Sequence, residues 1–371
     1  MKKSLIALAA LAASGFAMAQ SSVTLFGTVD TGVAVIDGAT TVTGMSNSGT
    51  SSSALGFRGV EDLGNGLKAG FHLEAGINTD NGDGAAGGAT GSGLEFARRS
   101  TISLMGGFGE LRLGRDLTAA YSAVSRFDPF GTVGVGSTRL WSGAAAAPSP
   151  LLNAGFNNVR RSNMLAYYSP SFGGFKVNVN YALGERVEAS NNGVRSGDTA
   201  GVAALYDNGP LSLSASYQQT GRSAVNAVTP ATAEEQYWAL GAAYDFGVVK
   251  LSAAYTNIQD KSVANETFYN REGDNYLIGL AVPVGAAGVV KASYNRYEAQ
   301  VGTAAKDKAD HYSLGYVHNL SKRTAVYGTY SYLKNKNNGS VFTLNNAGFT
   351  VPALDNSGKI QALQLGVRHS F

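Results

Sequence analysis

The sequence lacks cysteine altogether: none occurs in its 371 residues. This absence excludes a disulfide scaffold and a thiolate metal site. Beyond the N-terminal segment there is no run of about 18 apolar residues, so no transmembrane helix is expected there. Basic stripes interleaved with aromatic residues are also missing, which argues against a nucleic-acid partner. No linker rich in proline or charge divides the chain, and one domain is therefore predicted.

The first 19 residues have the composition of a cleaved secretory signal peptide. Lys2 and Lys3 form the charged head, residues 5–16 the apolar stretch, and residues 17–19 an A-x-A cleavage site. A membrane anchor is the alternative, but the apolar stretch is shorter than the roughly 18 to 20 residues that a spanning helix needs. Cleavage would leave residues 20–371 as the single domain, with nearly balanced charge.

Glycine and aromatic residues are both abundant in this chain. It contains 48 glycines, and aromatic side chains make up 10% of its residues. So much glycine is typical of disordered or repetitive chains, whereas this many aromatic residues argue against disorder. An exported β-protein with many turns satisfies both observations.

Three segments show the clearest strand pattern, because apolar and polar residues alternate along them. They are residues 175–181, residues 211–217 and, less strictly, residues 249–255. Successive side chains point to opposite faces of a strand, so each segment has one apolar and one polar face. A soluble β-sandwich would show the same alternation. The number of strands, the placement of aromatic residues and the lengths of the connections distinguish the two folds.

The connections alternate between short and long. Seven short ones, in which Gly and Asn supply the positive φ of tight hairpins, lie at residues 62–66, 106–109, 170–174, 207–210, 245–247, 284–288 and 319–323. Eight longer polar ones lie at residues 37–53, 81–93, 116–161, 186–198, 222–233, 261–272, 301–308 and 337–358. Fifteen connections join sixteen strands.

An even number of strands, with short turns on one side and long loops on the other, is typical of bacterial outer-membrane barrels. The predicted fold is therefore all-β, a 16-stranded antiparallel transmembrane β-barrel with short periplasmic turns and long external loops. Many apolar faces end in tyrosine, as expected of a girdle at the headgroup level, although tyrosine is also a good strand former. The girdle candidates are Tyr167, Tyr181, Tyr206, Tyr217, Tyr244, Tyr255, Tyr294, Tyr316 and Tyr330.

The connection at residues 116–161 is far longer than the usual hairpin loop of about 2 to 5 residues. A sixteen-stranded barrel is too wide for its own side chains to fill, so this third loop is predicted to fold inward and narrow the lumen. A loop that stays outside is the alternative. Of 16 arginines, eight lie between residues 98 and 161, with no lysine and only three acids. Guanidinium groups grip carboxylate and phosphate bidentately, so this composition predicts an anion path.

Strand alternation assigns charged side chains to the two faces. If Leu111 and Leu113 face lipid, Arg112 faces the lumen, and the same rule places Arg98 on the lipid side near the rim. Arginines opposed to acids across the constriction would create a transverse field. The predicted constriction residues are Arg58, Arg99, Arg112, Arg115, Glu110, Asp116 and Asp128. Weaker pore candidates are Lys68, Asp30, Arg98, Arg126, Arg139, Arg160 and Arg161.

No catalytic or metal-binding constellation emerges from the sequence. The four histidines are scattered and lack the spacing of metal ligands. No Ser/His/acid set falls on one face, and no cofactor motif is found. The chain is therefore predicted not to be an enzyme and to need neither a metal nor a cofactor.

Several motifs together resemble the trimeric general porins of β-proteobacterial outer membranes, and the resemblance covers the whole chain. They are SVTLFGTVD at residues 22–30, LGFRGVEDLGNGLKA at 55–69, FGELRLGR at 108–115, YSPSFGGF at 168–175 and GVRHSF at 366–371. The resemblance implies a sixteen-stranded barrel, a homotrimer, an inward-folded third loop and passive diffusion with anion preference. It also implies that the terminal Phe371 helps the barrel-assembly machinery to recognise the chain.

Three functions follow from these observations. The first is a general diffusion channel for small hydrophilic solutes and ions in the outer membrane, surrounded by membrane lipid and lipopolysaccharide. The second is a substrate-specific channel for carboxylates or phosphates that uses the same arginines. The third is an outer-membrane hydrolase or adhesin. An apolar patch formed by the first strands and the last is the expected interface between subunits.

Overall fold

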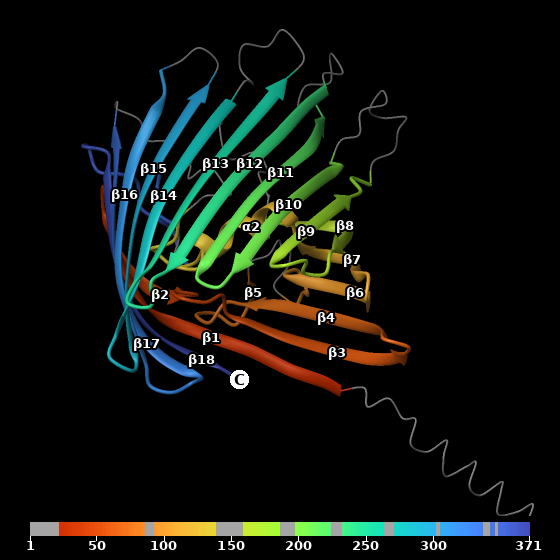
Figure 1. Cartoon of the computed structure of the whole chain (residues 1–371). Helices are drawn as coiled ribbons and strands as arrows, with labels where there is room; N and C mark the ends of the chain where they lie inside the picture. Colours follow the sequence, from red (N-terminus) through yellow and green to blue (C-terminus); the bar gives the residue numbers. More distant parts are fainter. Residues whose placement is uncertain are drawn as a thin grey trace, which may run out of the picture.

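The computed structural model describes residues 22–85, 93–138, 159–185, 197–223, 232–262, 271–301, 305–336, 342–345 and 348–371. They form one antiparallel sheet that closes on itself, because the first strand pairs with the last (Figure 1). The predicted signal peptide, residues 1–19, lies outside the described residues. No helix in the described part of the chain is long and apolar enough to cross a membrane.

The first nine strands are β1 (Ser22–Asp37), β2 (Thr41–Asn47), β3 (Ala54–Gly64), β4 (Leu67–Ile77), β5 (Gly84–Ala85), β6 (Arg99–Gly106), β7 (Gly109–Leu117), β8 (Arg160–Tyr168) and β9 (Phe175–Ala182). The remaining nine are β10 (Thr199–Asn208), β11 (Leu211–Ser223), β12 (Thr232–Asp245), β13 (Lys250–Ser262), β14 (Arg271–Val284), β15 (Gly288–Val301), β16 (Asp307–Asn319), β17 (Thr324–Lys336) and β18 (Lys359–Ser370). Two helical turns, α2 (Ala119–Val124) and η1 (Ser125–Phe127), follow β7.

The 18 strand segments occupy sixteen positions around the barrel. β2 and β3 pair with different halves of β1, so together they form one position. β5 and β6 likewise pair with different parts of β4 and form another. The prediction of a sixteen-stranded antiparallel barrel is therefore confirmed, and two of its strands are interrupted.

The short turns fall where the sequence predicts them. Gly109, Gly209 and Gly247 adopt φ values of 107°, 55° and 81°, which a side chain with a Cβ rarely tolerates. The strand ends that lead into the long connections lie at the end of the barrel opposite the short turns (Figure 1).

Alternation divides each strand between the outer and inner faces of the wall. Leu111 and Leu113 are 40% and 54% exposed on the outside, while Arg112 between them faces the lumen. Aromatic rings pair across neighbouring strands on the outer face, as in Tyr255–Tyr276 with ring centroids 5.1 Å apart. This arrangement agrees with an aromatic girdle around an apolar surface.

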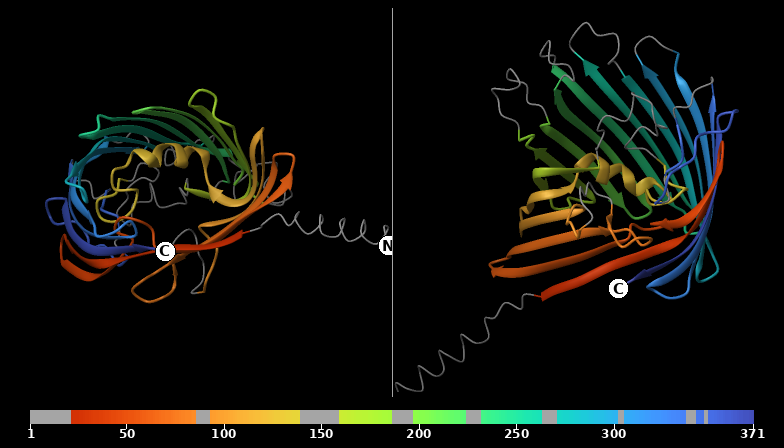
Figure 2. Two further views of the ribbon diagram at one scale, coloured as in Figure 1. Left: turned by 60° about the horizontal axis from the view of Figure 1, so that its bottom comes forward. Right: turned by 180° about the vertical axis from the view of Figure 1, so that it is seen from behind.

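The third loop lies inside the barrel, as predicted, for the part that is described. Residues 118–138 follow β7 and cross the lumen, and α2 sits within the ring of strands (Figure 2). Thr118 caps α2 by accepting a hydrogen bond from the Tyr121 amide at 3.2 Å. Strands β7 and β8 extend to Leu117 and from Arg160, so the loop is shorter at both ends than the predicted 116–161.

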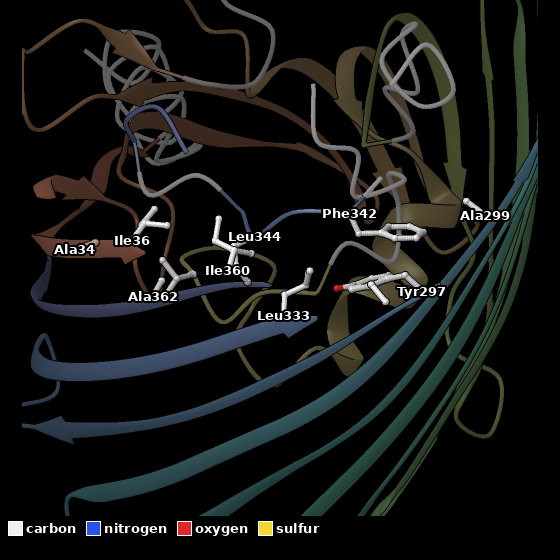
Figure 3. Close-up of a cluster of buried hydrophobic side chains, with 11 residues drawn as sticks. Ala34, Ile36, Tyr297, Ala299, Leu333, Phe342, Leu344, Ile360 and Ala362 are labelled. Carbon is white, nitrogen blue, oxygen red and sulfur yellow. The ribbon is translucent and has the colours of Figure 1, made fainter. Parts of the chain in front are cut away.

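The last long connection, expected to be external, also turns inward in its described part. Phe342 and Leu344 are 2% and 1% exposed and pack on the inner faces of β15, β17, β18 and β1 (Figure 3). The Phe342 ring stacks on Tyr297 with centroids 5.5 Å apart. The Asn345 side chain reaches the third loop, donating to the Gly134 carbonyl at 3.2 Å. Two loops therefore narrow the lumen.

Candidate pore constriction

An ion-paired group of four side chains lines the lumen on β6 and β7. Arg112 lies between two acids: its Nη2 is 2.8 Å from Glu110 Oε1 and its Nη1 is 2.5 Å from Asp116 Oδ2. Arg99 joins the group through its Nε, 3.3 Å from Asp116 Oδ2. The Arg112 guanidinium also lies 4.2 Å from the centre of the Tyr168 ring, a cation–π contact.

The order of charges in this group differs from the predicted transverse field. Glu110 and Asp116 lie beside Arg112 on the same strand, so positive and negative groups alternate along one wall. Within the group, two arginines are balanced by two carboxylates. The prediction correctly brings these four residues together, but they form a compensated chain rather than a bare positive wall.

Asp116 faces inward beside Arg112 because the two residues are an even number of positions apart on β7. The register between β7 and β8 shifts between Gly114 and Asp116. Gly114 adopts φ 127°, and a Cβ at this position would meet the Ser100 carbonyl oxygen at 2.0 Å. The extra residue of this β-bulge lies on β8, where three steps from Met164 to Arg161 oppose two on β7, and Asn163 there adopts a positive φ of 54°.

Arg115 lies apart from this group. Its Nε donates to the Ala97 carbonyl at 2.6 Å and its Nη1 to Ser162 Oγ at 2.8 Å. By alternation it shares the side of Leu111 and Leu113 rather than that of Arg112. Its geometry gives it a role in holding the segment before β6, and none in the four-residue group.

Arg58 faces the lumen, as predicted, and is exposed there. Its guanidinium lies 5.1 Å from the centre of the Phe26 ring, which in turn contacts the His72 ring edge-on at 5.2 Å. Among the described residues no carboxylate lies within ion-pair distance of Arg58. The ring holds the cation in place without neutralising it.

The placement of Arg98 on the lipid side was wrong. Its Nε pairs with Glu74 Oε1 at 2.5 Å, and Glu74 shares the inner face of β4 with His72 at 3.3 Å. Arg98 precedes the first residue of β6, so strand alternation does not apply to it. Arg160 reaches the same region and donates to the Arg98 carbonyl at 2.8 Å.

Arg126 and Asp128 hold the third loop in shape. Arg126 forms an ion pair with Asp207 on the inner face of β10, near a short turn. The Asp128 carboxylate accepts hydrogen bonds from the amides of Phe130, Thr132 and Thr138 and from the Thr138 hydroxyl, at 2.8 to 3.2 Å. Burial raises the pKa of Asp128 to about 6, while these hydrogen bonds act in the opposite direction.

Asp30 faces inward, as alternation predicts, but is fully buried. Its carboxylate accepts from the amides of residues 49–51, from the Thr50 hydroxyl and from Tyr327 Oη, at 2.6 to 3.0 Å. Five donors leave it no contact with the lumen. Asp30 anchors the first long connection and does not line the pore.

The other weaker candidates occupy separate places. Lys68 is exposed near a short turn, and Arg161 donates to Thr220 Oγ1 at 3.2 Å across the inner wall. Arg139 lies outside the described residues. These three side chains do not join the group around Arg112.

Two cations that face the lumen, on strands near the C-terminus, were not predicted from the sequence. Lys291 on β15 and Arg368 on β18 share the inner parity of buried neighbours such as Asn295 and Gln364. Both are half-buried, and Lys291 lies close enough to Asp128 for an electrostatic interaction. The same alternation that located Arg112 would have found them, had it been extended beyond the arginine-rich window.

The third loop docks on a row of glycines along the inner wall. A Cβ at Gly241 would meet the Phe127 ring at 2.2 Å, one at Gly279 would meet Pro129 at 2.5 Å, and one at Gly315 would meet the Phe130 ring at 2.8 Å. These glycines lie on β12, β14 and β16. Their missing side chains create the room in which residues 127, 129 and 130 of the loop are seated.

Metal chemistry finds no support in this region. Among the described residues, no group of three or more His, Asp or Glu side chains is arranged to hold a metal ion. The charged groups instead make ion pairs, cation–π contacts and hydrogen bonds around an open lumen. Such an arrangement can orient and select passing ions.

Comparison with known proteins agrees with this geometry. A family model described as Gram-negative porin matches residues 5–338. Outer membrane porin protein 32 of Delftia acidovorans is 42% identical, and an outer membrane porin protein of Bordetella pertussis is 32% identical, each over the whole of both chains. The solved structure of an anion-selective porin from Comamonas acidovorans matches with a TM-score of 0.82 and 39% identity, covering 95% of this chain and 100% of that one.

More distant solved structures share the fold. The trimer form of OmpT from Vibrio cholerae matches with a TM-score of 0.66 at 15% identity, covering 95% of this chain and 99% of that one. The family match, together with the closed barrel and its inward loop, confirms the predicted resemblance. The chain belongs to the Gram-negative porin family: it is an outer-membrane porin, and not an enzyme.

Proposed function

We propose that this porin is a water-filled channel for passive diffusion of small hydrophilic solutes and ions, with a preference for anions. One observation carries the proposal: the described acids around the narrowed lumen are engaged, whereas several cations there remain uncompensated. Selectivity then depends on the exposed positive charge and not on the total count of arginines.

The engaged acids are of two kinds. Asp30 and Asp128 are buried and accept several hydrogen bonds each from nearby amides and hydroxyls. Glu74, Glu110 and Asp116 are each paired with arginine at 2.5 to 3.3 Å. None of the five presents a bare carboxylate to a passing cation.

Three inward cations form no ion pair with a described acid: Arg58, Arg368 and Lys291, of which Lys291 has only a longer-range interaction with Asp128. Arg58 is exposed and its guanidinium lies over an aromatic ring, and no described carboxylate pairs with any of the three within 4.0 Å. A unit charge acts on an ion about 4 Å away with about 1 kcal/mol even in water, which is about fivefold in local anion concentration. The relative from Comamonas acidovorans, described as anion-selective, supports the same conclusion.

Planar-bilayer recording tests this proposal. The wild-type channel should show conductance proportional to salt, and its reversal potential in a KCl gradient should favour chloride. A reversal potential that favours potassium would contradict the anion preference without contradicting the barrel. Detergent-solubilised protein with no channel activity would contradict diffusion itself.

A specific channel for carboxylates or phosphates is the second candidate, and one cavity favours it. A polar cavity of about 340 Å³ lies between β2, the third loop and the last long loop, and Arg98 lines it together with Asn47, Asn78 and Asn345. Inorganic phosphate and succinate would then block chloride conductance at millimolar concentration, and Arg98→Gln would relieve the block. Absence of block would leave the general channel as the function.

A homotrimer follows from the apolar outer surface of the first and last strands. Val23 and Leu25 on β1 are 66% and 54% exposed, and Leu365 on β18 is 56% exposed. Contact between three such surfaces would remove them from lipid. Mass determination in detergent should give three chains, and a monomer would contradict this assembly.

The remaining partners and the leader belong to the same proposal. Residues 1–19 act as the cleaved leader, so the mature chain should begin at Gln20 in N-terminal sequencing. Phe371 continues the pairing of β18, since its amide donates to the Gly27 carbonyl at 3.0 Å. Its terminal ring is the feature that the barrel-assembly machinery would recognise. Membrane lipid and lipopolysaccharide surround the folded barrel.

A further inference from the structure

His72 lies on the inner wall of the barrel between Arg58 and Glu74. It is on β4, directly opposite Arg58 of β3 in the register of the sheet, and its side chain is 17% exposed. Histidine is the side chain whose charge ordinarily changes between pH 5 and pH 8. A histidine at this place can therefore change the charge of the pore wall with pH.

One aromatic ring holds His72 and Arg58 on the same part of the wall. The His72 ring meets the Phe26 ring edge-on, with centroids 5.2 Å apart, and the Arg58 guanidinium lies 5.1 Å from the centre of the Phe26 ring. Phe26 is on β1 and shares the inner face of that strand with the buried Asp30. The imidazole and the guanidinium are thus fixed beside each other at the lumen.

A single carboxylate serves both His72 and Arg98. Glu74 Oε2 lies 3.3 Å from His72 Nε2, and Glu74 Oε1 lies 2.5 Å from Arg98 Nε. While the imidazole is neutral, its Nε2–H donates to Glu74, and Arg98 balances the carboxylate. Protonation adds a second proton at Nδ1 and leaves the Nε2 hydrogen bond in place. The positive charge can therefore be added without breaking this contact.

The charged neighbours of His72 on β3 and β4 act in opposite directions. Arg58 on β3 disfavours a second positive charge, whereas Glu74 on β4 favours it. Arg98 precedes β6 and draws on the same carboxylate, so it weakens the effect of Glu74. Lys68 is four positions away on the same face of β4 and is exposed near the short turn. The pH at which His72 binds a proton depends on this balance.

The neighbour of His72 on β6 is uncharged. Thr101 lies opposite His72, and its hydroxyl accepts a hydrogen bond from Arg99 Nε at 3.3 Å. The same Arg99 nitrogen is 3.3 Å from Asp116 Oδ2, so the charge of Arg99 is balanced within the group around Arg112. The part of the wall that responds to a proton on His72 consequently consists of β3, β4 and the residue before β6.

Protonation of His72 doubles the net charge of this part of the wall. Arg58 and Arg98 are positive and Glu74 is negative, which leaves one net positive charge while the imidazole is neutral. A proton adds a second one. In water, a unit charge about 8 Å from a passing ion changes the local concentrations of anions and cations by about twofold each, in opposite directions. The chloride-to-potassium permeability ratio should therefore rise about fivefold.

We propose that His72 is a proton-binding group that tunes the ion selectivity of this pore, so that its protonation strengthens the preference for anions. This role rests on the proposed diffusion channel. It concerns how the selectivity changes with pH, whereas the sign of the selectivity at pH 8 tests the proposed function itself. The two can therefore fail separately.

Reversal potentials in a KCl gradient at pH 8 and pH 5 test the proposal. Asp128, whose pKa is raised by burial to about 6, also gains a proton in this range, so every channel is studied in the Asp128→Asn background. The parent channel should become about fivefold more selective for chloride at pH 5. Addition of His72→Gln should abolish most of this change.

His318→Gln is the matched control. His318 is on β16 near a short turn, where it shares the outer face with Tyr316 and its Nδ1 lies 3.0 Å from the Tyr316 hydroxyl. This variant also removes one imidazole, but from the side away from the lumen. Its selectivity should change with pH as in the parent channel. Equal pH responses in His72→Gln and His318→Gln would overturn the proposal.

Two further variants separate the charge of His72 from its structural contacts. His72→Arg carries a permanent charge, so at pH 8 it should match the parent channel at pH 5 and should no longer respond to pH. Glu74→Gln removes the carboxylate that favours the proton. Its chloride selectivity should rise at pH 8, and its pH response should move to more acidic values, because Arg58 and Arg98 then oppose protonation. The parental pH profile in either variant would contradict the role of His72.

Discussion

Docking of the third loop on the glycine row can be broken by a single methyl group. In Gly241→Ala the added Cβ would meet two atoms of the Phe127 ring at 2.2 Å and a third at 3.0 Å. Phe127 is 1% exposed, enclosed by α2 and by the inner faces of β12, β13 and β14. The ring has no free space to enter, so the loop itself must move.

The size of the effect follows from these contacts. The ring must retreat by about 1.2 Å before its contact with the new Cβ reaches the ordinary distance of 3.4 Å. Overpacking of this kind costs about 1 to 3 kcal/mol, less than the roughly 3 to 5 kcal/mol lost when a Phe side chain leaves a core. Since 1.4 kcal/mol is about tenfold, the docked loop should lose between about fivefold and 150-fold in population.

Single-channel recording measures the consequence. We expect Gly241→Ala to give larger and noisier open-channel currents than wild type, because the loop spends more time away from the wall. Gly273→Ala is the matched control: its Cβ would find only the Glu298 carbonyl oxygen, at an ordinary 3.7 Å. Identical conductance and noise in both variants would refute the docking argument, provided that both barrels fold.

Three further predictions concern the anchors of the fold. Tyr327→Phe removes one of the five hydrogen bonds to the buried Asp30 carboxylate. It should lower the free energy of unfolding, measured in urea, by about 1.5 to 3 kcal/mol. An unchanged urea concentration at the unfolding midpoint would contradict this prediction. Because burial raises the pKa of Asp128 from 3.8 to about 6, the docked loop binds a proton more tightly than the unfolded loop. The stability of the docked loop should be greatest below pH 3.8 and should fall by about 3 kcal/mol as the pH rises to 6. In single-channel recording this loss should appear as current noise that increases with pH. The variant Asp128→Asn should abolish this pH dependence. Deletion of Phe371 removes both of its backbone hydrogen bonds to Gly27 and should reduce the yield of folded barrel, and full yield would exclude its role in assembly.

Much of the barrel could be predicted because its signals are local. Glycine and asparagine at the short turns, and strict alternation between them, fix where each strand begins and which face meets lipid. The interruptions were not predictable from alternation, since β2 and β5 are recognised only by their pairing with β1 and β4. The inward turn near Phe342 was not predicted, because two apolar residues within a polar loop form no repeating pattern of the kind that identifies a strand.

The site was harder to predict than the fold. Alternation located Arg58, Arg99 and Arg112 correctly because all three lie within regular strands. It failed at Arg98, which precedes β6, and it could not reveal that Asp128 folds its own loop. Whether two charged side chains form an ion pair depends on the distance between their atoms in space. Only the structure therefore distinguishes the arginines that are paired with acids from the exposed ones.

The most direct test of the account compares an uncompensated charge with a compensated pair. Arg58→Gln removes an exposed cation, whereas Glu110→Gln combined with Arg112→Gln removes an ion pair of zero net charge. The reversal potential in a KCl gradient should shift toward potassium for Arg58→Gln and stay near the wild-type value for the double variant. An unchanged reversal potential in Arg58→Gln, or a larger shift in the double variant, would contradict the claim that exposed cations set the selectivity.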